Sequence, residues 1–129
     1  MSKDFESIDF GYIAEEIIEK IKNNETINVQ DKEEGFLRTA ISRAYYCVFL
    51  TAREKMRREL QKIPKDENVH QAVNQWLGKK NGKKAYDKFF NLRKMRNNAD
   101  YDLPPNFRAD VKVAEMALGL ARELLRAVV

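Results

Sequence analysis

The amino-acid sequence predicts an all-α fold, an up-and-down antiparallel four-helix bundle with an additional short helix. Three observations support this prediction. Apolar residues recur at helical spacing in several segments, no segment shows the alternating pattern of a strand, and the connections between segments are short. With 129 residues, 43% hydrophobic and 34% charged, the chain is expected to form a single helical domain over residues 1–129.

The longest of these segments, residues 36–60, predicts a central helix, with a start as early as Asp31 left open. Apolar side chains cover most of the circumference of its first half, so this helix is expected to be buried among its neighbours. Arg43 lies inside that surface, and burying an unpaired charge costs several kcal/mol. We therefore expect Arg43 to have a partner, and we interpret the nearby Cys47 as a buried packing residue.

Shorter helices are expected around the central one. The first has Asp9 as its N-cap and ends at Asn23. Pro64 breaks the pattern after the central helix, and a short helix then closes at Gly78. We interpret Trp76 in this short helix as a core or interface anchor. The expected flanking helices cover residues 9–23, a short segment that contains Val69 and Leu77, residues 83–99 and residues 107–128.

The net charge of +4 conceals a strong asymmetry along the chain. Residues 1–35 contain four lysines and ten acidic residues, whereas residues 79–96 contain eight basic residues and one acidic residue, Asp87. Such a split suits a phosphate-binding surface or association between copies of the protein, although a basic run is often a solvated surface.

Composition also excludes several classes of protein. No apolar run approaches the roughly 18 residues that a membrane span needs, and the acidic N-terminus lacks the apolar core of a signal peptide. The single cysteine cannot form an internal disulfide, and nothing around it has metal-ligand spacing. We expect a cytoplasmic protein with no membrane partner, no cofactor and no metal.

The candidate site centres on Arg96, at a position where the buried stripe of the fourth helix calls for an aliphatic residue. Asn97, Asp100 and Tyr101 follow at the end of that helix. One interpretation is structural, since Arg96 can pair with Asp100 four residues later. The other is functional, with these four side chains forming a pocket that binds phosphate or polarises an RNA backbone.

Two motifs on these segments resemble a known family. Residues 42–46, with the sequence SRAYY, lie on the central helix, and residues 96–101, which fit the pattern R-x-x-A-D-Y, follow some fifty residues later. Together they resemble the HEPN superfamily, and in particular its small stand-alone members. The resemblance covers nearly the whole chain. It implies a four-helix up-and-down bundle, usually a homodimer, that is often a toxin or partner encoded beside a minimal nucleotidyltransferase.

The resemblance also implies a chemistry. Active members are metal-independent ribonucleases whose signature is an arginine, usually followed by a polar residue, with four to six residues between the arginine and a histidine. Arg96 matches the arginine and Asn97 the polar residue. The positions expected for the histidine hold Tyr101, Asp102 and Leu103. A tyrosine with an ordinary pKa of about 10 is a poor general base at pH 7, whereas arginine and asparagine still recognise phosphate.

His70, the only histidine, is expected at the start of the short helix. It is either a cap or surface residue or, as in relatives with the SRAYY motif, a residue at the same end of the bundle as Arg96. The leading hypothesis is an HEPN-type domain that binds RNA or a nucleotide. Its polar site would be lined by Arg96, Asn97, Asp100, Tyr101 and Arg43, with Tyr46 as a further binding residue. The domain would be a toxin–antitoxin or defence component that works with a nucleotidyltransferase. The alternatives are a metal-independent endoribonuclease, with His70 or Asp100 as proton acceptor, and a non-catalytic structural or dimerisation module.

Overall fold

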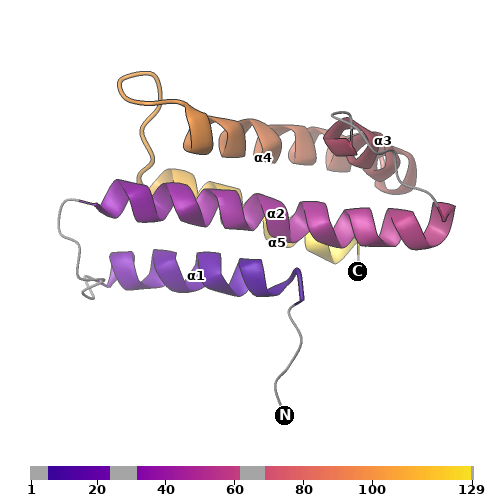
Figure 1. The fold of residues 1–129 in the computed structure, drawn as a ribbon, viewed down its shortest axis with the longest axis horizontal. Coiled ribbons are helices and arrows are strands. Elements are labelled where there is room, and N and C mark those ends of the chain that lie inside the picture. Colours follow the sequence, from indigo (N-terminus) through magenta and orange to yellow (C-terminus); the bar gives the residue numbers. More distant parts are fainter. Residues whose placement is uncertain (1–5, 24–31, 62–68, 129) are drawn as a thin grey trace, which may run out of the picture.

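The computed structural model describes residues 6–23, 32–61 and 69–128, and within these ranges the chain is all-helical (Figure 1). The helices are α1 (Asp9–Lys22), α2 (Glu33–Leu60), α3 (Val69–Asn81), α4 (Lys83–Tyr101) and α5 (Val111–Val128). The predicted helical bundle with an additional short helix is confirmed. None of the described helices is long and apolar enough to cross a membrane. The predicted break at Pro64 and the earliest predicted start of the central helix, Asp31, lie outside the described residues.

Helix α2 is the centre of the bundle, and every other helix packs against it. α1 and α4 lie along opposite sides of α2, α5 lies behind it, and α3 packs at the start of α4 (Figure 1). This position follows from the sequence of α2, because a helix with apolar residues around most of its circumference is stable only among neighbours. One row of α2 is only partly buried, and it includes Arg43 and Tyr46. The largest fully buried side chains of α2 are Tyr45, Ile41, Met56 and Val48.

Helix α1 approaches α2 closely at a glycine. A Cβ atom on Gly11 would lie 3.0 Å from Sγ of Cys47, so glycine lets the two backbones come together. Cys47 is completely buried, as predicted. The prediction that Asp9 caps α1 is wrong. Its carboxylate accepts the backbone N–H of Glu6 at 3.0 Å, and no side chain caps the start of this helix.

The prediction that the third helix closes at Gly78 is also wrong. The helix continues to Asn81, and the chain turns at Gly82, whose φ of 92° is a conformation that favours glycine. Gly78 lies instead against the ring of Tyr86, where a Cβ atom would meet the ring at 3.2 Å. The glycine therefore permits close packing of α3 on α4.

Helix α5 begins at Val111 and not at residue 107, so the predicted start is wrong. The physical reason is a cap, since Oδ1 of Asp110 accepts the backbone N–H of Val113 at 2.8 Å. The residues before Asp110 belong to a loop whose backbone is held by helix α2.

Arg38 and Glu34 of α2, which we call the arginine–glutamate clamp, fix this loop and the end of α4. The guanidinium of Arg38 donates hydrogen bonds to four backbone carbonyl oxygens, and Glu34 pairs with Arg38 at 3.0 Å. Glu34 also accepts the backbone N–H of Ala109 at 3.1 Å. The clamp therefore satisfies the last carbonyls of α4, which have no partner inside the helix. The four carbonyl oxygens belong to Asn98 (3.4 Å), Ala99 (3.0 Å), Asp102 (2.6 Å) and Phe107 (2.8 Å).

Candidate functional site

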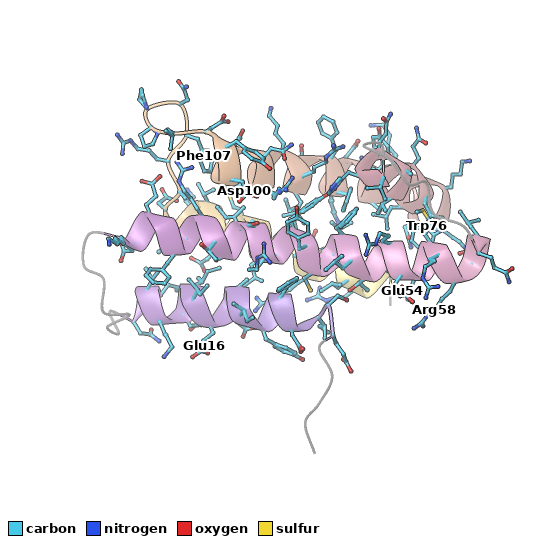
Figure 2. All side chains as sticks on the ribbon, in the orientation of Figure 1. Glu16, Glu54, Arg58, Trp76, Asp100 and Phe107 are labelled. Carbon is cyan, nitrogen blue, oxygen red and sulfur yellow. The ribbon has the colours of Figure 1, made fainter. Side chains whose placement is uncertain are left out.

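Helices α2 and α4 bring most of the predicted site residues together. The two helices run antiparallel and in contact (Figure 1). Hydrogen bonds from Ser42 to Asp100 and from Arg96 to Tyr46 show that residues 42–46 of α2 meet residues 96–101 of α4. In Figure 2, Asp100 lies on α4 near the end that leads to Phe107. We call this group of side chains the arginine–tyrosine cluster, and it comprises Ser42, Arg43, Tyr46, Arg96, Asn97, Asp100 and Tyr101.

Arg96 is the hub of the cluster, with a side chain that is 13% exposed. One terminal nitrogen donates a hydrogen bond to Oδ1 of Asn97 at 2.9 Å, and the other donates to the hydroxyl of Tyr46. Nε lies 2.9 Å from Oδ2 of Asp100, but the two are poorly aligned, so this contact is an ion pair rather than a hydrogen bond. The predicted ion pair between Arg96 and Asp100 is therefore formed. Both residues also belong to the group of side chains that was predicted to bind phosphate.

Arg43 has aromatic rings as its partners, rather than the carboxylate that burial of a charge suggests. Its guanidinium carbon lies 4.5 Å from the ring centroid of Phe10 and 5.1 Å from that of Tyr46. A guanidinium over a ring face is attracted by the negative charge density of the ring. Arg43 also donates a hydrogen bond to the hydroxyl of Ser42 at 3.4 Å, and Ser42 donates to Oδ2 of Asp100 at 3.3 Å. The two arginines are thus linked through a single carboxylate.

His70 of α3 lies next to the cluster within the same chain. Nδ1 of His70 is hydrogen-bonded to the hydroxyl of Tyr45, and the imidazole stacks on the ring of Phe49 with 4.1 Å between centroids. Tyr45 separates His70 from Arg96, whose guanidinium carbon lies 5.6 Å from the centroid of the Tyr45 ring. The side chain of His70 therefore packs against α2 instead of acting as a cap or a free surface residue. It lies in the same region of the bundle as Arg96.

The environment of His70 keeps its imidazole neutral. Burial and the nearby guanidiniums of Arg93, Arg96 and Arg53 lower the pKa of His70 from 6.5 to about 4. Burial likewise raises the pKa of Tyr45, which stays protonated. At pH 7 the pair is uncharged, and His70 is a weak proton acceptor.

Two cationic residues of this region, Arg53 and Arg93, were not among the site residues predicted from the sequence. The guanidinium carbon of Arg53 lies 5.6 Å from the centroid of the Phe49 ring. Nε of Arg93 is buried and has no hydrogen-bond partner in the part of the chain that the structure describes. Within the same part, neither side chain forms an ion pair, and neither does Arg43. The charge run of residues 79–96 contains Arg93, but charge alone does not show which of its members faces the site.

The geometry favours binding of an anion. The guanidiniums of Arg43, Arg53 and Arg96 lie beside aromatic rings of this region, and that of Arg93 lies near His70. Among the described residues, only Asp100 forms an ion pair with any of the four. Guanidinium groups match the oxygen atoms of phosphate. Among the described residues, no three histidine, cysteine or acidic side chains are placed to hold a metal ion.

The comparison with known families agrees with this architecture. The family model described as HEPN domain matches residues 14–129, almost the entire chain. The chain belongs to the HEPN family. At the level of the family, the chain is therefore a helical domain related to nucleotides or RNA. The HEPN chain matches no curated protein and no solved structure.

Proposed function

We propose that this HEPN domain, spanning residues 1–129, binds RNA or a nucleotide through the arginine–tyrosine cluster. The observation that carries the proposal is the position of Arg96. Its guanidinium is oriented by Asn97, Tyr46 and Asp100. It shares the ring of Tyr46 with Arg43, whose charge is balanced by ring faces rather than by a carboxylate. Two guanidiniums and one shared carboxylate leave a net positive site, which a phosphate group would neutralise.

The assembly is also part of the proposal. We infer a cytoplasmic homodimer that works with a nucleotidyltransferase partner as a toxin–antitoxin or defence component, as the family resemblance suggests. The charge distribution supports association, because acidic α1 and the basic segment of residues 79–96 lie on opposite sides of α2 (Figure 1).

Binding is tested with fluorescently labelled RNA and fluorescence anisotropy across a range of salt concentrations. Arg96→Gln and Arg43→Gln should each weaken binding by about 10- to 100-fold, because each removes charged hydrogen bonds to phosphate. Arg126→Gln is the matched control, because it removes the same charge from an exposed position on α5. Equal losses in all three variants would show that the protein binds RNA through its general charge and not through the cluster.

A second candidate, a metal-independent endoribonuclease, is favoured by the place of His70 beside Tyr45 and Arg96. Incubation of wild-type protein with mixed RNA in EDTA tests it, with Arg96→Ala in parallel. Cleavage that leaves cyclic phosphate ends and disappears in the variant supports catalysis, whereas RNA left intact by a wild type that binds it supports a binding module.

The structural alternative makes a different prediction for the same variant. If the cluster only fixes helix register, Arg96→Ala lowers the free energy of unfolding by roughly 3–5 kcal/mol, because it leaves Asp100 unpaired. The wild type would then bind no RNA. Chemical denaturation of the variant, measured beside the binding assay, separates this outcome from the first two.

A further inference from the structure

Helix α4 presents an outer row of side chains next to the arginine–tyrosine cluster. Phe90, Arg93, Asn97 and Tyr101 are spaced three or four residues apart, so they lie along one face of the helix. We call this row the α4 ridge. The side chains at its two ends are aromatic and open to solvent, since Phe90 is 54% exposed and Tyr101 is 70% exposed.

The two rings have different neighbours, and both are exposed to solvent. Tyr101 has the guanidinium carbon of Arg96 at 5.7 Å from its ring centroid, which leaves much of the ring open. Phe90 has no ring or cation contact within the described residues. Both rings are therefore available for a planar partner.

The polar members of the ridge suit the backbone of a nucleic acid. Asn97 uses Oδ1 to accept from Arg96, so its amide nitrogen remains available as a donor. Arg93 carries a charge that no carboxylate of the described residues neutralises, and its buried Nε has no partner there. Cations with aromatic stacking platforms beside them are features with which proteins bind single strands.

We propose that the α4 ridge is a track for single-stranded nucleic acid. Bases stack on Phe90 and Tyr101, while Arg93 and Arg96 contact the phosphates between them. The inference rests on the proposed function and specifies its ligand. The two aromatic residues are eleven positions apart, or about 16 Å along the helix axis, which corresponds to about three to five nucleotides of a single strand.

The same features argue against a mononucleotide and against a duplex. A mononucleotide reaches one ring and one phosphate subsite at a time. A duplex keeps its base faces stacked inside the helix, where an aromatic side chain on a protein surface cannot reach them.

The experiment measures anisotropy with labelled RNA oligonucleotides of two, four, six and eight nucleotides, and with a six-nucleotide RNA that carries abasic positions. Phe90→Ala and Tyr101→Ala should each weaken binding of the six-nucleotide RNA by about 5- to 100-fold, because each removes one stacking platform. Phe90→Tyr should retain binding. Tyr12→Ala is the matched control, since Tyr12 is 64% exposed but lies on α1, on the other side of α2.

Affinity should rise with length up to about four to six nucleotides and fall when the bases are absent. If Arg96→Gln abolishes binding while Phe90→Ala and Tyr101→Ala leave it unchanged, the track is wrong and the proposed function stands. If the wild type binds none of the oligonucleotides, both are wrong. If the two alanine variants instead convert a dimer to a monomer in sedimentation without changing RNA affinity, the ridge is a protein interface and the track is overturned.

Discussion

Replacing Arg38 with methionine removes the guanidinium of the arginine–glutamate clamp and retains most of the side-chain length. The side chain of Arg38 is 15% exposed and that of its partner Glu34 is 33% exposed. The variant leaves Glu34 without its cation and deprives the carbonyls of Ala99, Asp102 and Phe107 of short hydrogen bonds. Removing one partner of a buried pair costs about 3–5 kcal/mol, and water at the partly exposed Glu34 reduces that figure.

We therefore expect Arg38→Met to lower the free energy of unfolding by about 3 kcal/mol. For a chain of this length the loss corresponds to a melting temperature lower by roughly 10–15 °C. Arg38→Lys should have an intermediate effect, because an ammonium keeps the charge but cannot donate to the carbonyls as a planar fork.

The assay is urea denaturation followed by circular dichroism, with Arg57→Met as the control. Arg57 lies on the same helix and also pairs with a glutamate, Glu54, but its side chain is 55% exposed. Exposed pairs contribute about 0–1 kcal/mol. Losses of similar size in Arg38→Met and Arg57→Met would refute the reasoning, because burial and the carbonyl contacts would then have no effect.

Two further predictions concern pH and the backbone. The pKa of His70 is about 4 in the folded chain and 6.5 when unfolded, so between these values the unfolded state binds the extra proton and stability falls as the pH falls. Titration of the partly buried His70 ring should lower the free energy of unfolding by about 1–2 kcal/mol between pH 7 and pH 4. Urea denaturation at both pH values should therefore show a larger loss in the wild type than in His70→Asn, whose remaining loss comes from carboxylates with a lowered pKa, such as Glu54 and Glu123. Gly82→Ala should destabilise by about 1–2 kcal/mol because φ is positive there, whereas Gly35→Ala, in an open part of the first turn of α2, should stabilise by about 0.5–1 kcal/mol. Melting curves test the pair, and a change of the same sign in both would contradict the conformational explanation.

Local spacing was enough to predict the helices and part of the site. Arg96 and Asp100 are four residues apart on one helix, so their pairing follows from helical geometry without knowledge of the fold. Burial of Cys47 and the wide apolar surface of α2 likewise follow from periodicity. These features depend on residues close together in the chain.

Features that depend on distant backbone groups could not be predicted in this way. Arg38 donates hydrogen bonds to carbonyl oxygens some sixty residues away in the chain. Because every residue has a backbone carbonyl, the sequence does not indicate which carbonyl groups will be its partners. The i, i+4 spacing of Glu34 and Arg38 predicts the ion pair between these two residues, but it does not predict the contacts of Arg38 with the backbone of α4. The place of His70 beside Tyr45 depends on how α3 packs against α2, which periodicity within either helix does not determine.

The close contact between Gly11 and Cys47 makes the single thiol of the chain a reporter of helix detachment. Cys47 is covered where α1 crosses it, and burial raises the pKa of its thiol, so the packed state is protected from alkylation. Within the described residues, α1 contacts α2 and α5 but neither α3 nor α4, and it buries only three side chains. Separation of α1 would therefore leave the packing of α2 with α3, α4 and α5 in place. The rate at which a maleimide labels the folded chain would thus report how often α1 separates from the bundle, without any engineered probe.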